Sequence, residues 1–218
     1  KQAKKTNKDF NSADIVGIGV DTTGSTPLPV DKNGTPLSSF DEFKDNPNAY
    51  TWLWKDHTGH ADAAEITGLS EKERPEYLPK CGGTYSSEWF FSKILHCLRT
   101  DPKVFDAAYT WVECCDFITA SLTGTEKPES IKRCRCAAGH KAMFNNEWGG
   151  LPEKAFLAKL DPKLTEQRDQ LYEQSYAVND VAGKMTTAWA DKLGLKDGIP
   201  VAVRHFVLYH GPEVERGR

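Results

Sequence analysis

Short apolar runs mark three places where the chain is expected to form buried strands. Residues 13–21, ADIVGIGVD, are mostly apolar and end at Asp21. An uninterrupted run of this length is typical of a strand that is buried on both faces. TWLWKD at 51–56 and GIPVAV at 198–203 predict two further strands. TPLPVDKNGTPL at 26–37 predicts two extended pieces joined by a turn, because Asn-Gly favours the positive φ angles of tight hairpins.

The rest of the chain carries apolar positions at the spacing of amphipathic helices. SSEWFFSKILHCLRTDP at 86–102 is the clearest case, because Ser86 or Ser87 can cap its start, an apolar stripe follows, and Pro102 lies beyond its end. The other predicted helices are 60–69, ending near Gly68; the part of 110–124 that follows an extended entry, ending at Gly124; 151–160; and 183–195, ending at Gly194. Short buried strands that alternate with helices predict an α/β fold.

Composition narrows the class of protein. The 218 residues are 39% hydrophobic and 27% charged, which is typical of a globular chain with a substantial core and unlike a disordered one. The net charge of −3 gives no basic excess, so we expect no nucleic-acid partner. No apolar run approaches the roughly 20 residues of a membrane-spanning helix, and no apolar core of a signal peptide follows the basic N-terminus. Six cysteines, spaced unlike those of a small secreted protein, predict a cytoplasmic chain with reduced thiols.

A cluster of sulfur and imidazole side chains raises the question of a metal or thiol site. Cys134, Cys136 and His140 lie within CRCAAGH, about twenty residues after the adjacent Cys114 and Cys115. Structural zinc sites use Cys-x2-4-Cys or Cys/His pairs, and neither C-x-C nor C-C matches that spacing. We therefore expect no metal. A nucleophilic pair of Cys136 and His140 has no evident third orienting residue, and a metal- or thiol-dependent protein is the weakest alternative.

Three polar segments are candidates for binding a small molecule. TTGST at 22–26 follows the first predicted strand directly, where ligands gather in α/β sheets, and Gly24 would allow a close approach to the backbone. An ordinary turn explains this segment equally well. Trp54 in LWKDH could form an apolar wall beside polar groups, although a core position is the more usual role of a tryptophan. Lys141 of GHK could donate hydrogen bonds to hydroxyls or a phosphate, although most single lysines are solvated surface groups.

Five segments, taken in order, resemble the FGGY family of carbohydrate kinases: VGIGVDTTGSTPLPVDKNGTPL, NPNAYTWLWKDHT, GGTYSSEWFFSKILH, CAAGHKAMFNNEWGGLP and LDPKL. GVDTTGSTPLP and AAGHKA resemble the ribulokinase branch most. The resemblance covers roughly residues 14–203. It implies a ribonuclease-H-like domain of the actin-like ATPase superfamily, an α/β fold that is incomplete and carries helical insertions. Residues 1–203 are expected to form a partial N-terminal FGGY domain, and residues 204–218 a divergent tail.

The resemblance also implies a substrate and its contacts. The parent enzyme would transfer the γ-phosphate of ATP to L-ribulose, giving L-ribulose 5-phosphate in L-arabinose catabolism. Gly24 and Ser25 would lie closest to the ketose. Trp54 would form an apolar wall of the pocket and Lys141 would hydrogen-bond sugar hydroxyls, while Tyr85 matches a looser family pattern. The alternatives are another pentulose or polyol kinase, or a sugar-binding module without kinase activity.

The resemblance implies catalytic machinery outside this sequence. A family member carries a G-x-D-x-G-[ST] turn ahead of the segment that begins here at Asp14. It also carries a DAHxGAxG segment, whose Asp is the general base, after the strand predicted at 198–203, which is followed here by RHFVLYHGPEVERGR. We therefore expect no catalytic, cofactor-binding or metal-binding residue. ATP and Mg²⁺ would be held by a second domain and would not bind well to this chain alone, and an unpaired sheet edge would favour marginal stability or a homo-oligomer.

Overall fold

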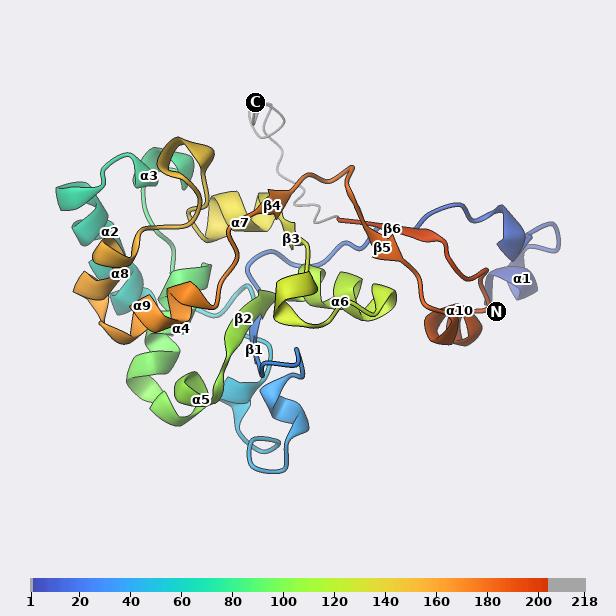
Figure 1. Ribbon diagram of the computed structural model, residues 1–218, viewed down its shortest axis with the longest axis horizontal. Coiled ribbons are helices and arrows are strands. Elements are labelled where there is room, and N and C mark those ends of the chain that lie inside the picture. Colours follow the sequence, from blue (N-terminus) through green and yellow to red (C-terminus); the bar gives the residue numbers. More distant parts are fainter. Residues whose placement is uncertain (1, 204–218) are drawn as a thin grey trace.

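The computed structural model describes residues 2–203, so the divergent tail expected at 204–218 lies outside the described residues. Residues 2–203 contain both strands and helices, so the fold is mixed α/β as predicted (Figure 1). The strands are β1 Pro27–Val30, β2 Thr110–Glu113, β3 Arg133–Cys134, β4 Ser175–Tyr176, β5 Val181–Lys184 and β6 Pro200–Ala202. The helices are α1 Gln2–Thr6, α2 His60–Glu73, α3 Tyr77–Lys80, α4 Phe90–Thr100, α5 Pro102–Ala107, α6 Cys114–Thr123, α7 Arg135–Lys141, α8 Lys154–Leu160, α9 Lys163–Asp169 and α10 Thr187–Leu193.

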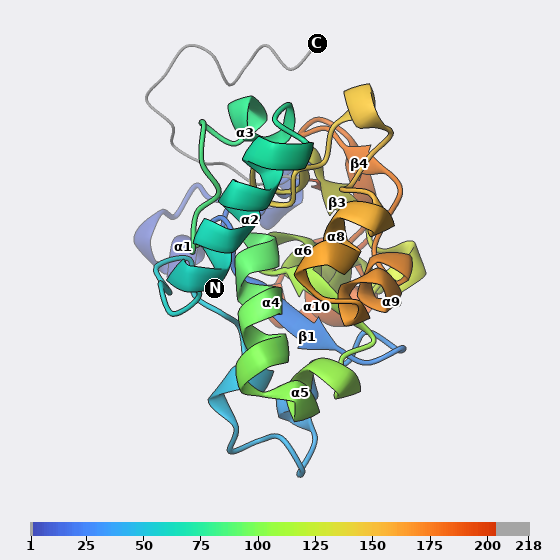
Figure 2. The same ribbon diagram turned by 90° about the vertical axis from the view of Figure 1, so that its left-hand side faces the viewer.

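One end of the molecule is a helical lobe formed by α2, α3, α4, α5, α8 and α9 (Figure 1). Within it α2 and α4 lie side by side (Figure 2). The largest hydrophobic cluster fills this lobe, and its fully buried side chains include Tyr77, Phe90, Phe91, Trp111 and Phe156. Eight of the eleven residues of α4 are buried, so this helix is the central element of the lobe.

The antiparallel pair of β1 and β2 positions the segment that precedes β1. Pro27 lies opposite Glu113 in the register, and all residues of both strands are buried. The pairing continues for one bond beyond the strands, because the Cys114 N–H donates to the Thr26 carbonyl at 3.0 Å. Residues 22–26 therefore lie beside the end of β2. The helix α6 follows at once and ends at Gly124, which takes the left-handed conformation, as the sequence predicts.

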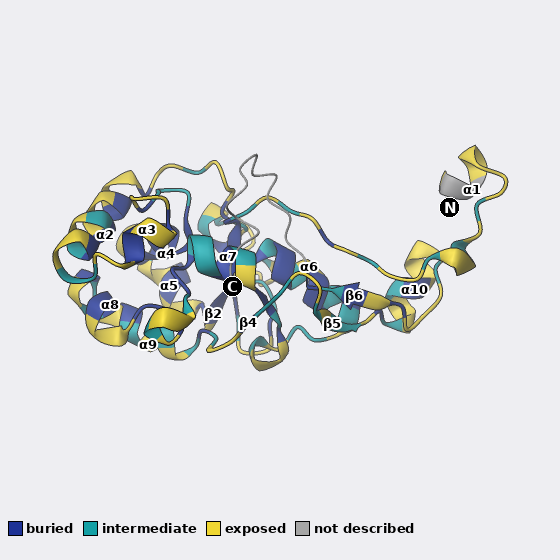
Figure 3. Cartoon of the chain, turned by 90° about the horizontal axis from the view of Figure 1, so that it is seen from above, coloured by how far each residue is buried: buried dark blue, intermediate teal, exposed yellow. Residues whose placement is uncertain are grey.

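The opposite end of the molecule is an arm formed by β5, β6, α10 and residues 11–20 (Figure 1). β5 and β6 pair antiparallel, and Ile18 makes a parallel bridge to Val201 of β6. A small apolar cluster around Met185 and Val201 holds the arm together, while much of its surface is exposed (Figure 3). The helix α10 ends at Gly194 in the left-handed conformation, as predicted.

The buried strand predicted over 13–21 is wrong. Ile18 alone bridges to β6, and Val16 is 82% exposed. The reason is that β6 spans three residues and pairs with β5 along its other edge, so this end of the chain meets only a short edge. Val20 reaches the small apolar cluster of the arm, whereas its neighbours face solvent. The strand predicted over 198–203 is confirmed as β6.

The strand predicted over 51–56 is also wrong. The Trp52 N–H donates to the Pro27 carbonyl at 2.9 Å, and Trp52 is buried, but Trp54 already lies in an exposed turn. A ladder cannot extend from this single bond, because Pro27 and Pro29 of β1 have no backbone N–H to donate. The apolar residues of this segment therefore reflect a loop that touches the core at one point.

Several predicted helix ends differ from the observed ones; the helix predicted over 183–195, for example, begins only at Thr187, because Gly183 and Lys184 belong to β5. The helix α2 runs through Gly68 to Glu73, because Ser70 in its last turns is fully buried and its hydroxyl donates to the Ile66 carbonyl at 2.8 Å. The helix α4 begins at Phe90 rather than after Ser86 or Ser87. The Tyr85 hydroxyl accepts the Phe91 N–H, which is one of the free N–H groups in the first turn of this helix. The predicted turn at 31–34, with Gly34 at φ +81°, is confirmed.

Candidate functional site

The candidate binding residues gather around the start of α4. Trp89 is the N-cap residue of this helix, and Lys93 follows one turn later; both are buried. Lys93 contacts the backbone of the loop 22–26 and of Leu53, and Trp89 contacts Lys141 at the end of α7. The start of α4 thus joins three segments that are far apart in the sequence.

Lys93 is a buried ammonium group with two backbone acceptors. Its Nζ donates to the Ser25 carbonyl at 2.6 Å and to the Leu53 carbonyl at 2.7 Å, and the residue is 1% exposed. Burial lowers the pKa of Lys93 to about 8, and the nearby carboxylate of Glu113 opposes part of this shift. Lys93 therefore ties the loop 22–26 to the segment that carries Trp54.

Glu113, the last residue of β2, holds the next position of the same loop. Its Oε2 accepts the Thr26 N–H at 2.8 Å, whereas its Oε1 has no hydrogen-bond partner among residues 2–203. Burial raises the pKa of Glu113 to about 7; the bond from Thr26 lowers it and repulsion from Asp116 raises it further. A buried polar atom without a partner often marks a place for a ligand or an ordered water molecule.

The loop 22–26 contains a strained residue next to a glycine. Ser25 has φ +50°, an uncommon backbone conformation for a residue with a side chain, and it is fully buried. Its Oγ also has no hydrogen-bond partner within the described part of the chain. Gly24 precedes it at a half-buried position, and the hydroxyls of Thr23 and Thr26 lie 2.9 Å apart. Such a conformation persists only where the surroundings hold it.

Lys141 and Tyr85 lie together where α7 meets α4. Lys141 Nζ lies 5.2 Å from the centroid of the Trp89 ring, and burial lowers the pKa of Lys141, with Cys136 opposing the shift. The Tyr85 hydroxyl donates to the Lys141 carbonyl at 2.5 Å and accepts the Phe91 N–H at 2.9 Å. Tyr85 therefore uses its hydroxyl to join α7 to α4. Lys141 is the last residue of the helix α7.

Trp54 lies at the surface, so it is not a core residue. Trp54 lies in the turn at 54–55, and the residue is 44% exposed. The preceding carbonyl, that of Leu53, is fixed by Lys93. An exposed indole on a fixed backbone presents a flat apolar face beside polar groups.

Sequence reasoning missed Lys93 and Glu113. Lys93 stands within the apolar stripe of α4, beside Ile94, and Glu113 ends the otherwise apolar strand β2. A charged residue on a buried face is costly unless it is paired. This interruption of an apolar pattern was the available indication for both residues.

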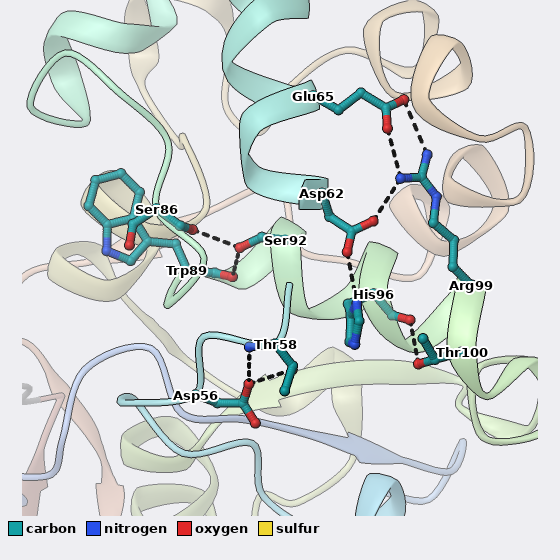
Figure 4. Close-up of polar contacts among 10 residues, drawn as sticks. All are labelled: Asp56, Thr58, Asp62, Glu65, Ser86, Trp89, Ser92, His96, Arg99 and Thr100. Carbon is teal, nitrogen blue, oxygen red and sulfur yellow. Dashed lines mark hydrogen bonds and ion pairs between the residues drawn. The ribbon is translucent and has the colours of Figure 1, made fainter. Parts of the chain in front are cut away.

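A second group of charged residues, of which Asp62 is buried, joins α2 to α4, and Figure 4 shows its contacts. Asp62 is 4% exposed; one of its oxygens lies 2.8 Å from His96 Nδ1 and the other accepts from Arg99 Nη1 at 2.7 Å. Arg99 also donates to Glu65 at 2.7 Å and to the Leu160 carbonyl at 3.3 Å. We call Asp62, Glu65, His96 and Arg99 the α2–α4 network. Asp62 belongs to α2, and both of its carboxylate oxygens contact side chains of α4. We therefore infer that this network holds α2 against α4.

The thiol and imidazole side chains of α7 are poorly suited to form a nucleophilic pair. Burial raises the pKa of Cys136 to about 11 and lowers the pKa of His140 to about 4. A thiolate–imidazolium pair requires the opposite shifts. None of the six cysteines, all within residues 2–203, forms a disulfide, and Cys134 is the buried N-cap residue of α7. Within residues 2–203, no three His, Cys, Asp or Glu side chains form a group that could hold a metal ion, and no helix is long and apolar enough to cross a membrane.

Comparison with known sequences finds relatives over almost the whole chain. No family model matches it. The sequence is 47% identical over 198 residues to the ribulokinase of Vibrio parahaemolyticus, and 39% identical over 204 residues to that of Bacillus licheniformis. These alignments cover 90% and 93% of this chain but 35% of each relative. The chain thus spans about a third of the length of the curated relatives it matches.

Solved structures of sugar and polyol kinases share the fold. The xylulose kinase of Rhodospirillum rubrum matches with a TM-score of 0.63 and 19% identity, over 92% of this chain and 36% of that one. The glycerol kinase of Plasmodium falciparum with ADP matches with a TM-score of 0.64 and 16% identity, also over 92% and 36%. Identities this low establish the fold alone. The expected α/β fold is confirmed as one that these solved kinases share.

Proposed function

We propose that this chain, which is homologous to ribulokinases over about nine-tenths of its length, forms much of the sugar pocket of an ATP-dependent L-ribulose kinase. The reaction transfers the γ-phosphate of ATP to a hydroxyl of L-ribulose and gives L-ribulose 5-phosphate. Because the chain spans about a third of these relatives, we assign the general base and the ATP site to the part of a ribulokinase that it does not span. A kinase that consumes ATP in sugar breakdown would act in the cytoplasm.

The gathering of the candidate residues around the start of α4 carries this proposal. The loop 22–26, Trp54 and Lys141 belong to the segments whose sequence resembles ribulokinases. Lys93 bonds to the backbone of the first segment and to the residue before Trp54, and Trp89 contacts Lys141. Trp89 and Lys93, one turn apart at the start of α4, thus contact the segments that would bind the sugar together.

Each candidate group suits a polyol ligand through a different property. Trp54 offers an apolar face for the C–H groups of the sugar, and the Lys141 ammonium offers donors for its hydroxyls. Gly24 lets a hydroxyl approach the backbone, and the Ser25 Oγ, which lacks a partner among residues 2–203, is ready to pair with one. Tyr85 would contribute by fixing the carbonyl of Lys141 rather than by direct contact.

ATP and Mg²⁺ would take part in the complete enzyme. Mg²⁺ neutralises the charge that develops on the transferred phosphoryl group, and phosphoryl transfer depends mainly on such positioning and electrostatics. Residues 2–203 offer no group of three His, Cys, Asp or Glu side chains for the metal. We therefore assign none of them to Mg²⁺ or to the nucleotide.

Isothermal titration of the chain with L-ribulose tests the proposal. We expect binding by the wild type and roughly ten- to a hundredfold weaker binding by Lys141→Ala, because a lost charged hydrogen bond costs about 1.5–3 kcal/mol. Lys72→Ala is the matched control, since Lys72 is an exposed lysine on α2. Circular dichroism verifies that each variant is folded. Absence of heat from a folded wild type, or equal affinities of all three proteins, would contradict a sugar pocket at Lys141.

Titration with D-xylulose and with glycerol tests the choice of substrate. A ribulokinase pocket should bind L-ribulose more tightly than either compound. Tighter binding of D-xylulose or glycerol would instead favour another pentulose or polyol kinase.

A further inference from the structure

One peptide unit of the loop 22–26 is held at both ends by buried charges. The Ser25 carbonyl accepts from Lys93 Nζ at 2.6 Å, and the N–H of the same peptide, that of Thr26, donates to Glu113 Oε2 at 2.8 Å. Lys93 comes from α4 and Glu113 from β2, so two separate elements hold opposite ends of one peptide bond. Hydrogen bonds to charged groups are about twice as strong as neutral ones.

We propose that Lys93 and Glu113 are positioning residues of the sugar pocket, which clamp the Ser25–Thr26 peptide and thereby fix the loop 22–26 and the segment that carries Trp54. We call this arrangement the peptide clamp. The inference rests on the proposed function, because only there is the loop a sugar contact. Neither positioning residue touches the sugar; both act through the backbone that they hold.

The backbone of the loop explains why a clamp is needed. Ser25 has φ +50°, and a residue with a side chain adopts this conformation at a cost in free energy. Ser25 cannot hold itself there, because its own Oγ forms no hydrogen bond with the described residues. The two charged side chains on either side of the peptide therefore add to the restraint that the Cys114 N–H provides through the Thr26 carbonyl.

The second acceptor of Lys93 extends the restraint to a second segment. Nζ donates to the Leu53 carbonyl at 2.7 Å, directly before Trp54. Trp54 is 44% exposed, so its own packing contributes little to holding it in place. One ammonium group thus sets the spacing between the loop 22–26 and the aromatic face that would flank the sugar.

The charges of the clamp depend on pH. The groups that face Lys93 are Glu113 from β2, Asp56 from the segment before α2, Glu88 from the turn before α4 and Lys141 from α7, and Glu113 also faces Asp116 from α6. Burial lowers the pKa of Lys93 to about 8 and raises the pKa of Glu113 to about 7. Below about pH 7 the Glu113 carboxylate is mostly protonated, and above about pH 8 the Lys93 ammonium group loses its proton. The clamp is therefore strongest between about pH 7 and 8.

Hydrogen exchange of the full chain tests the clamp without any ligand. Lys93→Met removes the donors and keeps an apolar side chain of similar length. We expect about tenfold faster exchange of the amides in 22–26 and 51–56, and unchanged exchange in α6 and α10. Lys72→Met, at an exposed position of α2, should leave both loops at wild-type rates. Thermal unfolding checks that Lys93→Met is still folded, since the variant leaves Glu113 without the nearby ammonium group.

Two variants of Glu113 separate positioning from a general loss of packing. Glu113→Gln keeps an oxygen acceptor for the Thr26 N–H and should retain most of the protection of the loop. Glu113→Ala removes the acceptor and should lose that protection. In the wild type, exchange of the loop, corrected for its intrinsic pH dependence, should be slowest between about pH 7 and 8, and Lys93→Met should abolish the acceleration above pH 8.

Titration with L-ribulose completes the test and separates the two proposals. Lys93→Met should bind the sugar about tenfold more weakly than the wild type at pH 7.5. If the loops exchange at wild-type rates in Lys93→Met and Glu113→Ala, the clamp is overturned whatever the sugar result. If the loops loosen and the affinity is unchanged, the positioning role is overturned. If a folded wild type binds no L-ribulose while the variants still loosen the loops, the proposed function fails, and the clamp as a restraint on the loop is supported.

Discussion

The helix α4 takes part in two groups of charged residues, each with at least one buried member, and they are built in different ways. In the α2–α4 network, one oxygen of Asp62 contacts His96 and the other contacts Arg99 (Figure 4). In the peptide clamp, Lys93 donates only to backbone carbonyls, and Glu113 leaves one oxygen without a hydrogen-bond partner among residues 2–203. Satisfied charges stabilise a helix contact, whereas incompletely satisfied ones lower stability and are expected where a ligand or a strained loop requires them.

The two groups also differ in what they join. The α2–α4 network links two long helices within the helical lobe, and its loss should lower the free energy of unfolding. The peptide clamp links a helix and a strand to the loop 22–26 and to Leu53, and its loss should leave the fold in place. Stability and sugar affinity should therefore respond to different substitutions.

Removal of Asp62 should give the largest effect. Asp62→Ala takes away the shared acceptor of His96 and Arg99, so we expect the free energy of unfolding to fall by about 3 kcal/mol. Urea unfolding measures this change. Asp41→Ala is the control, since the Asp41 side chain is 97% exposed and its ion pair with Lys44 should contribute under ~1 kcal/mol. Asp62→Ala protein that is still folded should bind L-ribulose like the wild type, and a loss of affinity as large as that of Lys141→Ala would show that the two groups are not separate.

The pH dependence of stability should report the buried charge of Lys93. Its pKa falls from 10.5 to about 8 on folding, so between these pH values the unfolded chain binds a proton that the folded chain does not, and stability rises with pH. Relative to Lys93→Met, the wild type should gain on the order of 2 kcal/mol between pH 8 and 10.5. Urea unfolding of both proteins at several pH values measures the difference. A constant difference would mean that Lys93 titrates like an exposed lysine.

Substitution of Trp54 should change affinity without changing stability. Trp54→Ala removes the proposed apolar wall, and we expect about tenfold weaker binding of L-ribulose by titration calorimetry. Because the residue is 44% exposed, the free energy of unfolding should change by less than ~1 kcal/mol. Trp54→Phe keeps an apolar face and should retain most of the affinity. A large loss of stability would instead make Trp54 a core residue.

Two glycines of the α2 region should give the smallest effects, with opposite signs. An added Cβ at Gly68 meets nothing within 4 Å, so Gly68→Ala should stabilise the helix by about 0.5–1 kcal/mol. A Cβ at Gly59 would lie 3.0 Å from the Ser92 carbonyl oxygen, so Gly59→Ala should destabilise the contact between α2 and α4 by a similar amount. Thermal unfolding compares the two variants. Equal signs would contradict the close approach of the two helices at Gly59.

Predictions from local sequence succeeded where one segment decides the outcome. The left-handed glycines Gly124 and Gly194 end α6 and α10 as predicted, because a glycine after an apolar helical stretch needs no distant partner to act as a C-cap. The prediction over 13–21 failed, because an apolar run becomes a buried strand only if neighbouring strands and a covering layer are available. Among the described residues, Ile18 pairs with β6 through a single bridge to Val201, and β6 is only three residues long.

The sequence by itself determined the α/β class, several helix ends and the resemblance to carbohydrate kinases, since these depend on periodicity, caps and short motifs. It also indicated Gly24, Ser25, Trp54, Tyr85 and Lys141 as residues of interest. Only the tertiary structure revealed that Lys93 and Glu113 hold one peptide from two elements, and that Tyr85 bonds to the backbone of α7. The reason is that burial and pairing of a charge depend on contacts between residues 68 and 87 positions apart, which no local pattern records.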